Sequence, residues 1–316
     1  MIPAEWIEQA SARIGPYIQP TPLTYDARLG CHVKWENRQV TGSFKVRGAL
    51  NKVLGLQAWE RKAGLVAASA GNHGQGVALA GRITKSPVVV FASEHAVAIK
   101  LDAIRALGAD VHLVQGGYPE AEAAGLAYAA EHGATWVSPY NDGQVIAGQG
   151  TIALEIFAEL PEAINSTWLV PVSGGGLISG IGVSLKMKSP AAELVGVQAA
   201  ASPFTHSLFY RGTQENVPDL PSLADGLTGA VESDSVTVPL MRKYVDDILL
   251  VEEEQIAKAV AYAWHVHGEK IEGSGAVTLA ALLDGKIKPP ALVVISGGNI
   301  QPEVHAEICT RYKESV

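Results

Sequence analysis

One lysine near the start of the chain stands in an unusual setting. Lys45 lies between Phe44 and Val46 in the segment TGSFKVRGA, which Gly42 and Gly48 bracket. Most lysines of a globular protein extend into water, and a surface position is the ordinary interpretation of a single lysine. A lysine in this guarded position is also a candidate nucleophile, because covalent catalysis uses amines held close to a bound substrate or cofactor.

Three glycine-containing turns accompany this lysine. They are SAGNHGQG (69–76), SGGGLISG (173–180) and SGGNI (296–300). Each follows an expected strand, and ligands of open α/β sheets bind beyond the carboxyl ends of strands, so we expect the turns to line one site.

The middle turn has the best composition for binding an anion. Gly174, Gly175 and Gly176 let the backbone approach a ligand closely and lead into an expected helix N-terminus. A tight turn without a ligand is an equally open interpretation on these residues alone. The segment matches neither GxGxxG nor GxxxxGK[ST], so it does not favour a dinucleotide or a nucleoside triphosphate.

Short apolar runs alternate with alanine-rich helical stretches and would position these turns. Strands are expected at 65–69, 87–93, 109–115, 134–140, 166–172, 192–198, 247–251 and 291–296. A polar loop is expected from the end of the sixth strand to about Val238. Continuous apolar strands separated by helices predict parallel sheets that are covered on both faces. Two packed α/β domains are therefore expected.

Composition excludes several classes of protein. With 316 residues, of which 47% are hydrophobic, the chain can bury a large core. A net charge of −8 without a lysine and arginine cluster argues against nucleic-acid and anionic-membrane partners. Cys31 and Cys309 form neither a metal motif nor a disulfide framework. The N-terminus shows no signal segment and no long apolar run follows, so a cytoplasmic location is expected.

A lysine near a phosphate cradle, but outside any P-loop pattern, is what a lysine bonded to the cofactor would look like if that cofactor were pyridoxal phosphate. With its other motifs, the chain resembles the serine/threonine dehydratase family of fold-type-II pyridoxal-phosphate enzymes, to which serine racemase also belongs. The resemblance covers nearly the whole length. The matching motifs, in the family's order, are TGSFKVRGA, SAGNHGQGVA (69–78), VIAGQGTIALEI (145–156), the glycine turn with Leu177, ADGL (224–227), EGSGA (272–276) and SGGN (296–299).

The resemblance implies an α/β, two-domain, tryptophan synthase beta-like fold with open, mostly parallel sheets flanked by helices. The large cofactor-binding domain would comprise residues 1–48 and 145–316, and the small domain residues 49–144. Pyridoxal 5'-phosphate is the implied cofactor, a small amino acid the implied substrate, and a homodimer or homotetramer the implied assembly. The chain ends soon after SGGN, so the resemblance predicts catabolic kinetics without a C-terminal regulatory domain.

The resemblance also assigns roles to individual residues. Lys45 would bond covalently to the cofactor, Phe44 would pack on the ring face, Asn72 would bind the ring hydroxyl, Ser296 would face the ring nitrogen, and Gly174, Gly175, Gly176 and Leu177 would donate amides to the phosphate. The substrate carboxylate would lie among Ser69, Ala70, Gly71, Asn72 and His73. His73 is expected to stabilise its loop, because Lys45 already serves as the base. From the residues alone, Phe44 as a core residue, Asn72 as a turn residue and Ser296 as a strand cap stay open.

The departures from the family pattern carry information too. Ser173 stands where the family commonly has a fourth glycine, and its hydroxyl could bind the phosphate or cap the strand. Ala70 occupies the position of the racemases' second serine, and alanine has no transferable proton, which favours elimination over racemisation. Gln198, Ser202 and Phe204 stand where some relatives bind a divalent cation, so we expect no metal site.

These features predict a pyridoxal-phosphate-dependent ammonia-lyase. It would convert an L-β-hydroxy amino acid of the threonine or serine type to a 2-oxo acid and ammonia by α,β-elimination. The alternatives are dehydration of a hydroxyectoine-derived substrate, which the SGGGLISG variant suggests, dehydration of a 3-hydroxyaspartate-type substrate, and serine racemisation. A non-catalytic phosphate-binding module is the alternative from another class.

Overall fold

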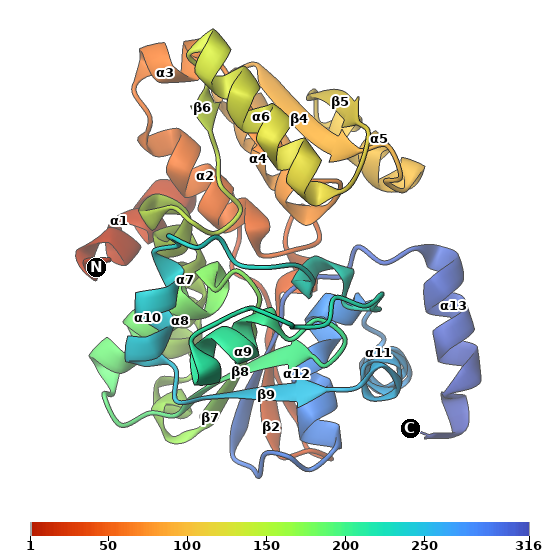
Figure 1. Ribbon diagram of the computed structural model, residues 1–316. Helices are drawn as coiled ribbons and strands as arrows, with labels where there is room; N and C mark the ends of the chain where they lie inside the picture. The colour runs from red at the N-terminus through yellow and green to blue at the C-terminus, as the bar shows by residue number, and fades with distance from the viewer. Residues whose placement is uncertain (1, 316) are drawn as a thin grey trace.

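Two sheets organise the chain, and the computed structural model describes residues 2–315 (Figure 1). The larger sheet has six strands in the order β1-β2-β10-β7-β8-β9. Only β1 and β2 pair antiparallel; the other pairs are parallel. The strands are β1 (Leu23–Asp26), β2 (Cys31–Trp35), β10 (Ala291–Ile295), β7 (Thr167–Pro171), β8 (Leu194–Ala199) and β9 (Asp247–Val251).

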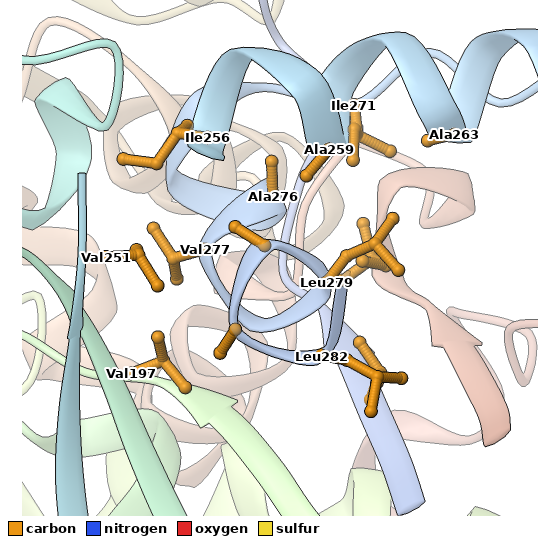
Figure 2. Packing of buried hydrophobic residues seen from close by; sticks show 14 of the residues in the cluster. Val197, Val251, Ile256, Ala259, Ala263, Ile271, Ala276, Val277, Leu279 and Leu282 are labelled. Atoms are coloured by element: carbon orange, nitrogen blue, oxygen red, sulfur yellow. The ribbon is translucent and has the colours of Figure 1, made fainter. Parts of the chain in front are cut away.

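Helices cover both faces of the larger sheet. On one face α12 (Gly273–Leu283) packs on the strands, with α11 (Glu253–His267) beside it. Figure 2 shows Val277 of α12 facing Val197 and Val251 of the strands. On the other face lie α7 (Gly143–Glu159) and α8 (Gly176–Lys188). Burial on both faces explains why every residue of β8 and β10 is buried.

The smaller sheet is entirely parallel and has the order β5-β4-β3-β6. Its strands are β3 (Leu65–Ala68), β4 (Val88–Ser93), β5 (Asp110–Val114) and β6 (Thr135–Trp136). One face packs against α2 (Lys45–Gly55) and α4 (Asn72–Thr84), and the other against α6 (Tyr118–His132). The predicted α/β fold with two mostly parallel sheets is confirmed.

The remaining helices lie around these two layered units. They are α1 (Glu5–Ile14), α3 (Ala58–Ala63), α5 (Ala98–Ala106), α9 (Phe204–Arg211), α10 (Thr237–Tyr244) and α13 (Pro302–Arg311), with short 3-10 turns η1 (Glu36–Arg38), η2 (Pro161–Asn165), η3 (Asp225–Leu227) and η4 (Lys313–Ser315). Within residues 2–315, no helix combines the length and apolar character that crossing a membrane requires.

Two sequence-based expectations are wrong in detail. The strand expected at 134–140 is only the two residues of β6, because Ser138 then turns the chain by accepting a hydrogen bond from the Asn141 amide at 2.9 Å. The polar loop expected up to Val238 contains all of α9 and the start of α10. Tertiary contacts fix α9, since the Gln198 side chain accepts from the His206 amide at 3.0 Å.

The division into residues 1–48 with 145–316 and residues 49–144 stays a prediction. Its two breaks fall inside α2 and just after the start of α7. The smaller sheet is formed from segments between 65 and 136, and the larger sheet from segments on either side of it.

A buried cluster of charges ties α2 to the rest of the fold. Arg47 donates to Glu36 at 2.7 Å and to Glu155 at 2.6 Å, and Lys34 donates to Glu155 at 2.7 Å. Burial alone would lower the pKa of Arg47, but the two carboxylates raise it, so the guanidinium stays charged. The cluster joins β2, η1, α2 and α7 through fully paired charges.

Arg47→Met should destabilise the protein by about 3–5 kcal/mol, because it leaves the fully buried Glu36 side chain without its partner. Denaturant unfolding followed by circular dichroism measures the loss. The control is Arg38→Met, whose side chain is 57% exposed where it pairs with Glu269, and it should cost at most about 1 kcal/mol. Equal losses in both variants would contradict a structural role for the buried cluster.

Candidate active site

All three predicted glycine turns leave the carboxyl ends of parallel strands. The first joins β3 to α4, the second joins β7 to α8, and the third follows β10. The first and third turns meet, since the Asn299 side chain donates to Asn72 Oδ1 at 2.6 Å. The third turn also reaches the lysine segment, where Ser43 and Gly297 form an isolated antiparallel bridge. Segments far apart in the sequence thus meet around Lys45.

Lys45 is the first residue of α2, and its side chain is half-buried. Its amine donates to the Pro139 carbonyl at 2.9 Å and lies 5.2 Å from the centre of the Phe44 ring. Burial lowers the pKa of Lys45 to about 8, although the negative charge of Glu272 opposes this shift. A substantial part of the amine is therefore neutral just above neutral pH and able to act as nucleophile or base.

The glycine loop before α8 has no room for side chains. A Cβ on Gly174 would overlap the Tyr140 ring, and one on Gly176 would lie 2.9 Å from Tyr140 Cβ. Gly175 has a φ of +84°. Two hydrogen bonds also hold the loop in place. Thr205 donates to the Ser173 carbonyl and Thr237 donates to the Gly174 carbonyl, each at 2.6 Å.

These two hydrogen bonds involve the loop's carbonyl groups and do not use its amides. Amides in the first turn of a helix have no acceptor within that helix, and α8 begins at Gly176. A phosphate fits such a helix N-terminus, where unpaired amides and the helix dipole both favour negative charge. The loop geometry therefore fits the phosphate of the expected cofactor.

The residues expected around the cofactor ring lie close together. The Phe44 amide donates to the Ser296 carbonyl at 3.0 Å, which joins the lysine segment to the end of β10. The Ser296 hydroxyl is buried and has a long contact of 3.4 Å to the Ser274 carbonyl. Asn72 donates one amide hydrogen to Glu272 at 2.6 Å, which leaves its second N–H for a ligand.

The segment expected around the substrate carboxylate forms the turn into α4. The Gly71 amide donates to the Ser69 hydroxyl at 3.1 Å, while Ala70 is half-buried. His73 is buried and its Nε2 lies 2.7 Å from the Val137 carbonyl, so this nitrogen carries the proton. Burial, followed by the Lys45 charge, lowers the pKa of His73 to about 3. A neutral, loop-bound His73 supports the expectation that Lys45 is the base.

Three residues at the site escaped the sequence analysis as individuals. They are Tyr140, Glu272 and Asn299. Burial raises the pKa of Glu272 to about 7, the Asp225 charge adds to this shift, and the Asn72 hydrogen bond opposes it. The signal for Glu272 was its place in EGSGA, where a carboxylate precedes an apolar helix. Tyr140 lay in the expected strand, and Asn299 was noted only as part of SGGN.

No metal cluster lies among residues 2–315: no group of three or more His, Cys, Asp or Glu side chains is placed to hold an ion. The Ser202 hydroxyl, at one of the positions compared with the relatives' cation site, donates to Asp219 at 2.7 Å. Cys31 and Cys309 are buried free thiols.

Comparison with known proteins agrees with this geometry. The family model for the pyridoxal-phosphate dependent enzymes matches residues 14–297. The chain belongs to this family. An L-threonine ammonia-lyase of Thermotoga maritima is 43% identical over 309 residues, which cover 95% of this chain and 76% of that protein. A catabolic L-threonine dehydratase of Staphylococcus aureus is 37% identical over 93% of this chain and 88% of its own length.

Solved structures show the same architecture. Maize serine racemase has a TM-score of 0.90 at 28% identity, over 99% of this chain and 98% of that one. The processed form of threonine deaminase isoform 2 from Solanum lycopersicum has a TM-score of 0.87 at 29% identity, over 97% of this chain and 92% of that one. The chain is a fold-type-II pyridoxal-phosphate enzyme.

Lys45→Ala should keep the fold and lose covalent attachment of the cofactor, because no other amine takes the place of Lys45. The wild-type holoenzyme should absorb at about 410–420 nm, as expected for cofactor bonded to a lysine. Borohydride reduction followed by peptide mass spectrometry should place the added mass on Lys45. Added mass on another lysine would show that this assignment is wrong.

Proposed function

We propose that the protein is an ammonia-lyase that converts an L-β-hydroxy amino acid of the threonine or serine type to a 2-oxo acid and ammonia. The observation that carries the proposal is the half-buried Lys45 amine, whose pKa is lowered to about 8. Ala70, where the racemases have a second serine, has no side-chain acid or base. Relatives with 37–43% identity that are named for threonine deamination support it.

In this proposal Gly174, Gly175, Gly176 and Leu177 hold the cofactor phosphate, and Phe44, Asn72 and Ser296 hold its ring. When bound, pyridoxal phosphate supplies an electron sink for the electron pair left at the substrate α-carbon. Ser296 offers the ring nitrogen a neutral hydroxyl in place of a carboxylate, which makes the sink a moderate one and favours rapid expulsion of the β-substituent.

The protein's own part is proton transfer and orientation. The neutral Lys45 amine removes the substrate α-proton, and the β-hydroxyl leaves as water after gaining a proton. The resulting enamine hydrolyses in solution to the 2-oxo acid and ammonia. Ser69, Gly71, Asn72 and the buried His73 line the turn that would orient the substrate carboxylate.

Ala70→Ser tests whether proton transfer is confined to the Lys45 side. The wild-type enzyme should form pyruvate from L-serine with almost no D-serine, because the far side lacks a proton donor. The variant should form measurable but modest amounts of D-serine, and its folding should hardly change. Chiral chromatography of both reactions gives the answer. Abundant D-serine from the wild-type enzyme would refute the preference for dehydration over racemisation.

A second candidate function rests on two carboxylates, Glu122 and Glu232, in the neighbourhood of Tyr140. Tyr140 directly follows Pro139, which accepts from Lys45, and the Tyr140 hydroxyl accepts from the Glu232 amide at 3.0 Å. Glu232 in turn accepts from Asn141 at 2.7 Å. Burial raises the pKa of Glu122, the Tyr118 hydrogen bond opposes the shift, and the Glu232 charge adds to it. Glu122 and Glu232 are therefore electrostatic neighbours.

Within residues 2–315, neither carboxylate forms an ion pair with a lysine, arginine or histidine of the chain. Glu122 comes from α6 of the smaller-sheet unit, whereas Glu232 lies in the loop before α10. Their shared negative potential favours a hydroxy amino acid with a cationic side chain, such as a hydroxylated diaminobutyrate. This agrees with the hydroxyectoine-derived alternative and disfavours 3-hydroxyaspartate, whose second carboxylate would be repelled.

Glu232→Gln and Glu122→Gln test this second candidate. If it holds, the wild-type enzyme has a higher kcat/KM for 3-hydroxy-2,4-diaminobutyrate than for L-threonine, and each variant reduces that preference about 10-fold. Activity on L-threonine should change less than about threefold. Glu131→Gln, at the exposed far end of α6, is the matched control. If the wild-type enzyme prefers L-threonine and neither variant alters this preference, the second candidate is wrong and only the threonine-type function remains.

A homodimer or homotetramer and a cytoplasmic location also belong to this proposal, and the family resemblance supports both. Light scattering on the purified protein measures the assembly directly.

A further inference from the structure

Glu272 behaves unlike an ordinary residue at its position. It is the N-cap residue of α12, where a carboxylate commonly accepts hydrogen bonds from the first turn of its own helix. No such hydrogen bond is made. Instead Glu272 Oε1 accepts from Asn72 Nδ2 at 2.6 Å, across 200 positions of sequence. The side chain is only 6% exposed, so this contact replaces both helix capping and hydration.

The contact is part of a continuous chain of hydrogen bonds. Asn72 Oδ1 accepts from Asn299 Nδ2 at 2.6 Å, and the same Asn299 nitrogen donates to the Thr41 carbonyl at 2.9 Å. Both ends of the Asn72 amide are thereby fixed, one by α12 and the other by the turn after β10. With one N–H given to Glu272, a single amide hydrogen of Asn72 remains for a ligand.

Nearby glycines are required by this arrangement. A Cβ on Gly297 would collide with Glu272 Oε1 and lie 3.2 Å from Asn72 Nδ2. Gly42 has a φ of +71°, and a Cβ there would lie 2.5 Å from Asn299 Oδ1. The TGSFK and SGGN segments thus approach the Glu272–Asn72–Asn299 network so closely that only glycine fits.

We propose that Glu272 is a positioning residue of the cofactor site: it orients the Asn72 amide toward the cofactor ring, and its charge acts on Lys45. The inference rests on cofactor binding and not on which amino acid the enzyme deaminates. Asn72 begins α4, which connects β3 and β4 of the smaller sheet, whereas Glu272 precedes α12 on the larger sheet and Asn299 follows β10. The network therefore also joins the two sheet units beside the lysine.

The charge of Glu272 gives the proposal a second consequence. The charged groups acting on it are Asp225 of η3, Lys100 of α5 and Lys45 of α2, with Asn72 and Asn299 as hydrogen-bond donors. Its negative charge favours the protonated amine of Lys45. Removing that charge therefore lowers the pKa of Lys45 further below about 8, and the neutral amine becomes available at lower pH.

A double-mutant cycle on cofactor affinity tests the positioning role. Glu272→Ala and Asn72→Ala should each raise the dissociation constant of pyridoxal phosphate about 10- to 100-fold, because each leaves a buried polar partner unsatisfied. Glu272→Ala introduced into the Asn72→Ala protein should raise it clearly less than in the wild type, since the positioning effect of Glu272 requires Asn72 and only its charge effect on Lys45 remains. Glu252→Gln, at the exposed N-cap of α11, is the matched control and should bind normally.

The pH dependence of cofactor uptake separates this role from a purely structural one. The rate at which the apoprotein gains its visible absorbance should reach half-maximum at lower pH in Glu272→Ala than in the wild type or Asn72→Ala. Circular dichroism of each apoprotein checks folding, and a Glu272→Asp variant extends the test if Glu272→Ala is unfolded. Additive losses in the cycle, or an unchanged pH midpoint, would overturn the proposal. Every readout is cofactor binding, so a failure of this proposal can be distinguished from a failure of the proposed lyase activity.

Discussion

The buried pairing of Arg47 with Glu36 and Glu155 is the interaction on which the site depends. Arg47 lies two residues after Lys45 in α2, so the cluster fixes the first turn of the helix that carries the reactive amine. Burying these charges is costly unless each is paired, and a misplaced helix would leave them unpaired. A close backbone approach adds to the constraint, since a Cβ on Gly148 of α7 would lie 2.6 Å from the Arg47 carbonyl oxygen.

Burial shifts the pKa values of Lys45, in α2, and of Glu272 in opposite directions. It lowers the pKa of Lys45 to about 8 and raises the pKa of Glu272 to about 7. Both shifts favour the neutral form, because desolvation penalises either charge. The charge that Glu272 presents to Lys45 therefore changes near neutral pH, close to the range in which Lys45 itself titrates. Burial also leaves His73 uncharged, because it lowers the pKa of this residue to about 3.

The fold and the cofactor could be predicted because their signals are local, whereas the role of Lys45 as the reactive lysine stays a prediction. Continuous apolar runs such as 291–296 predicted buried parallel strands, and the motif around Lys45 indicated the cofactor chemistry. The errors arose where tertiary contacts decide structure: α9 is held by the Gln198 side chain, and β6 ends where Ser138 turns the chain. Glu272 could not be assigned from sequence, because its partner lies 200 residues away and nothing local distinguishes it from a helix cap.

Residues inside the family motifs and residues outside them are expected to serve different purposes, cofactor chemistry and choice of substrate. Lys45, Asn72 and the glycine loop lie in family motifs, and in our proposal they account for cofactor binding and proton removal. Glu122 and Glu232 lie outside every motif, on α6 and on the loop before α10, yet Tyr140 links their neighbourhood to both Lys45 and the glycine loop. In our second proposal, substitutions at such positions would change the charge that the substrate side chain meets and leave the cofactor contacts intact. On that proposal, residues outside the motifs would decide which hydroxy amino acid is accepted, because the motifs serve the cofactor chemistry that the family shares.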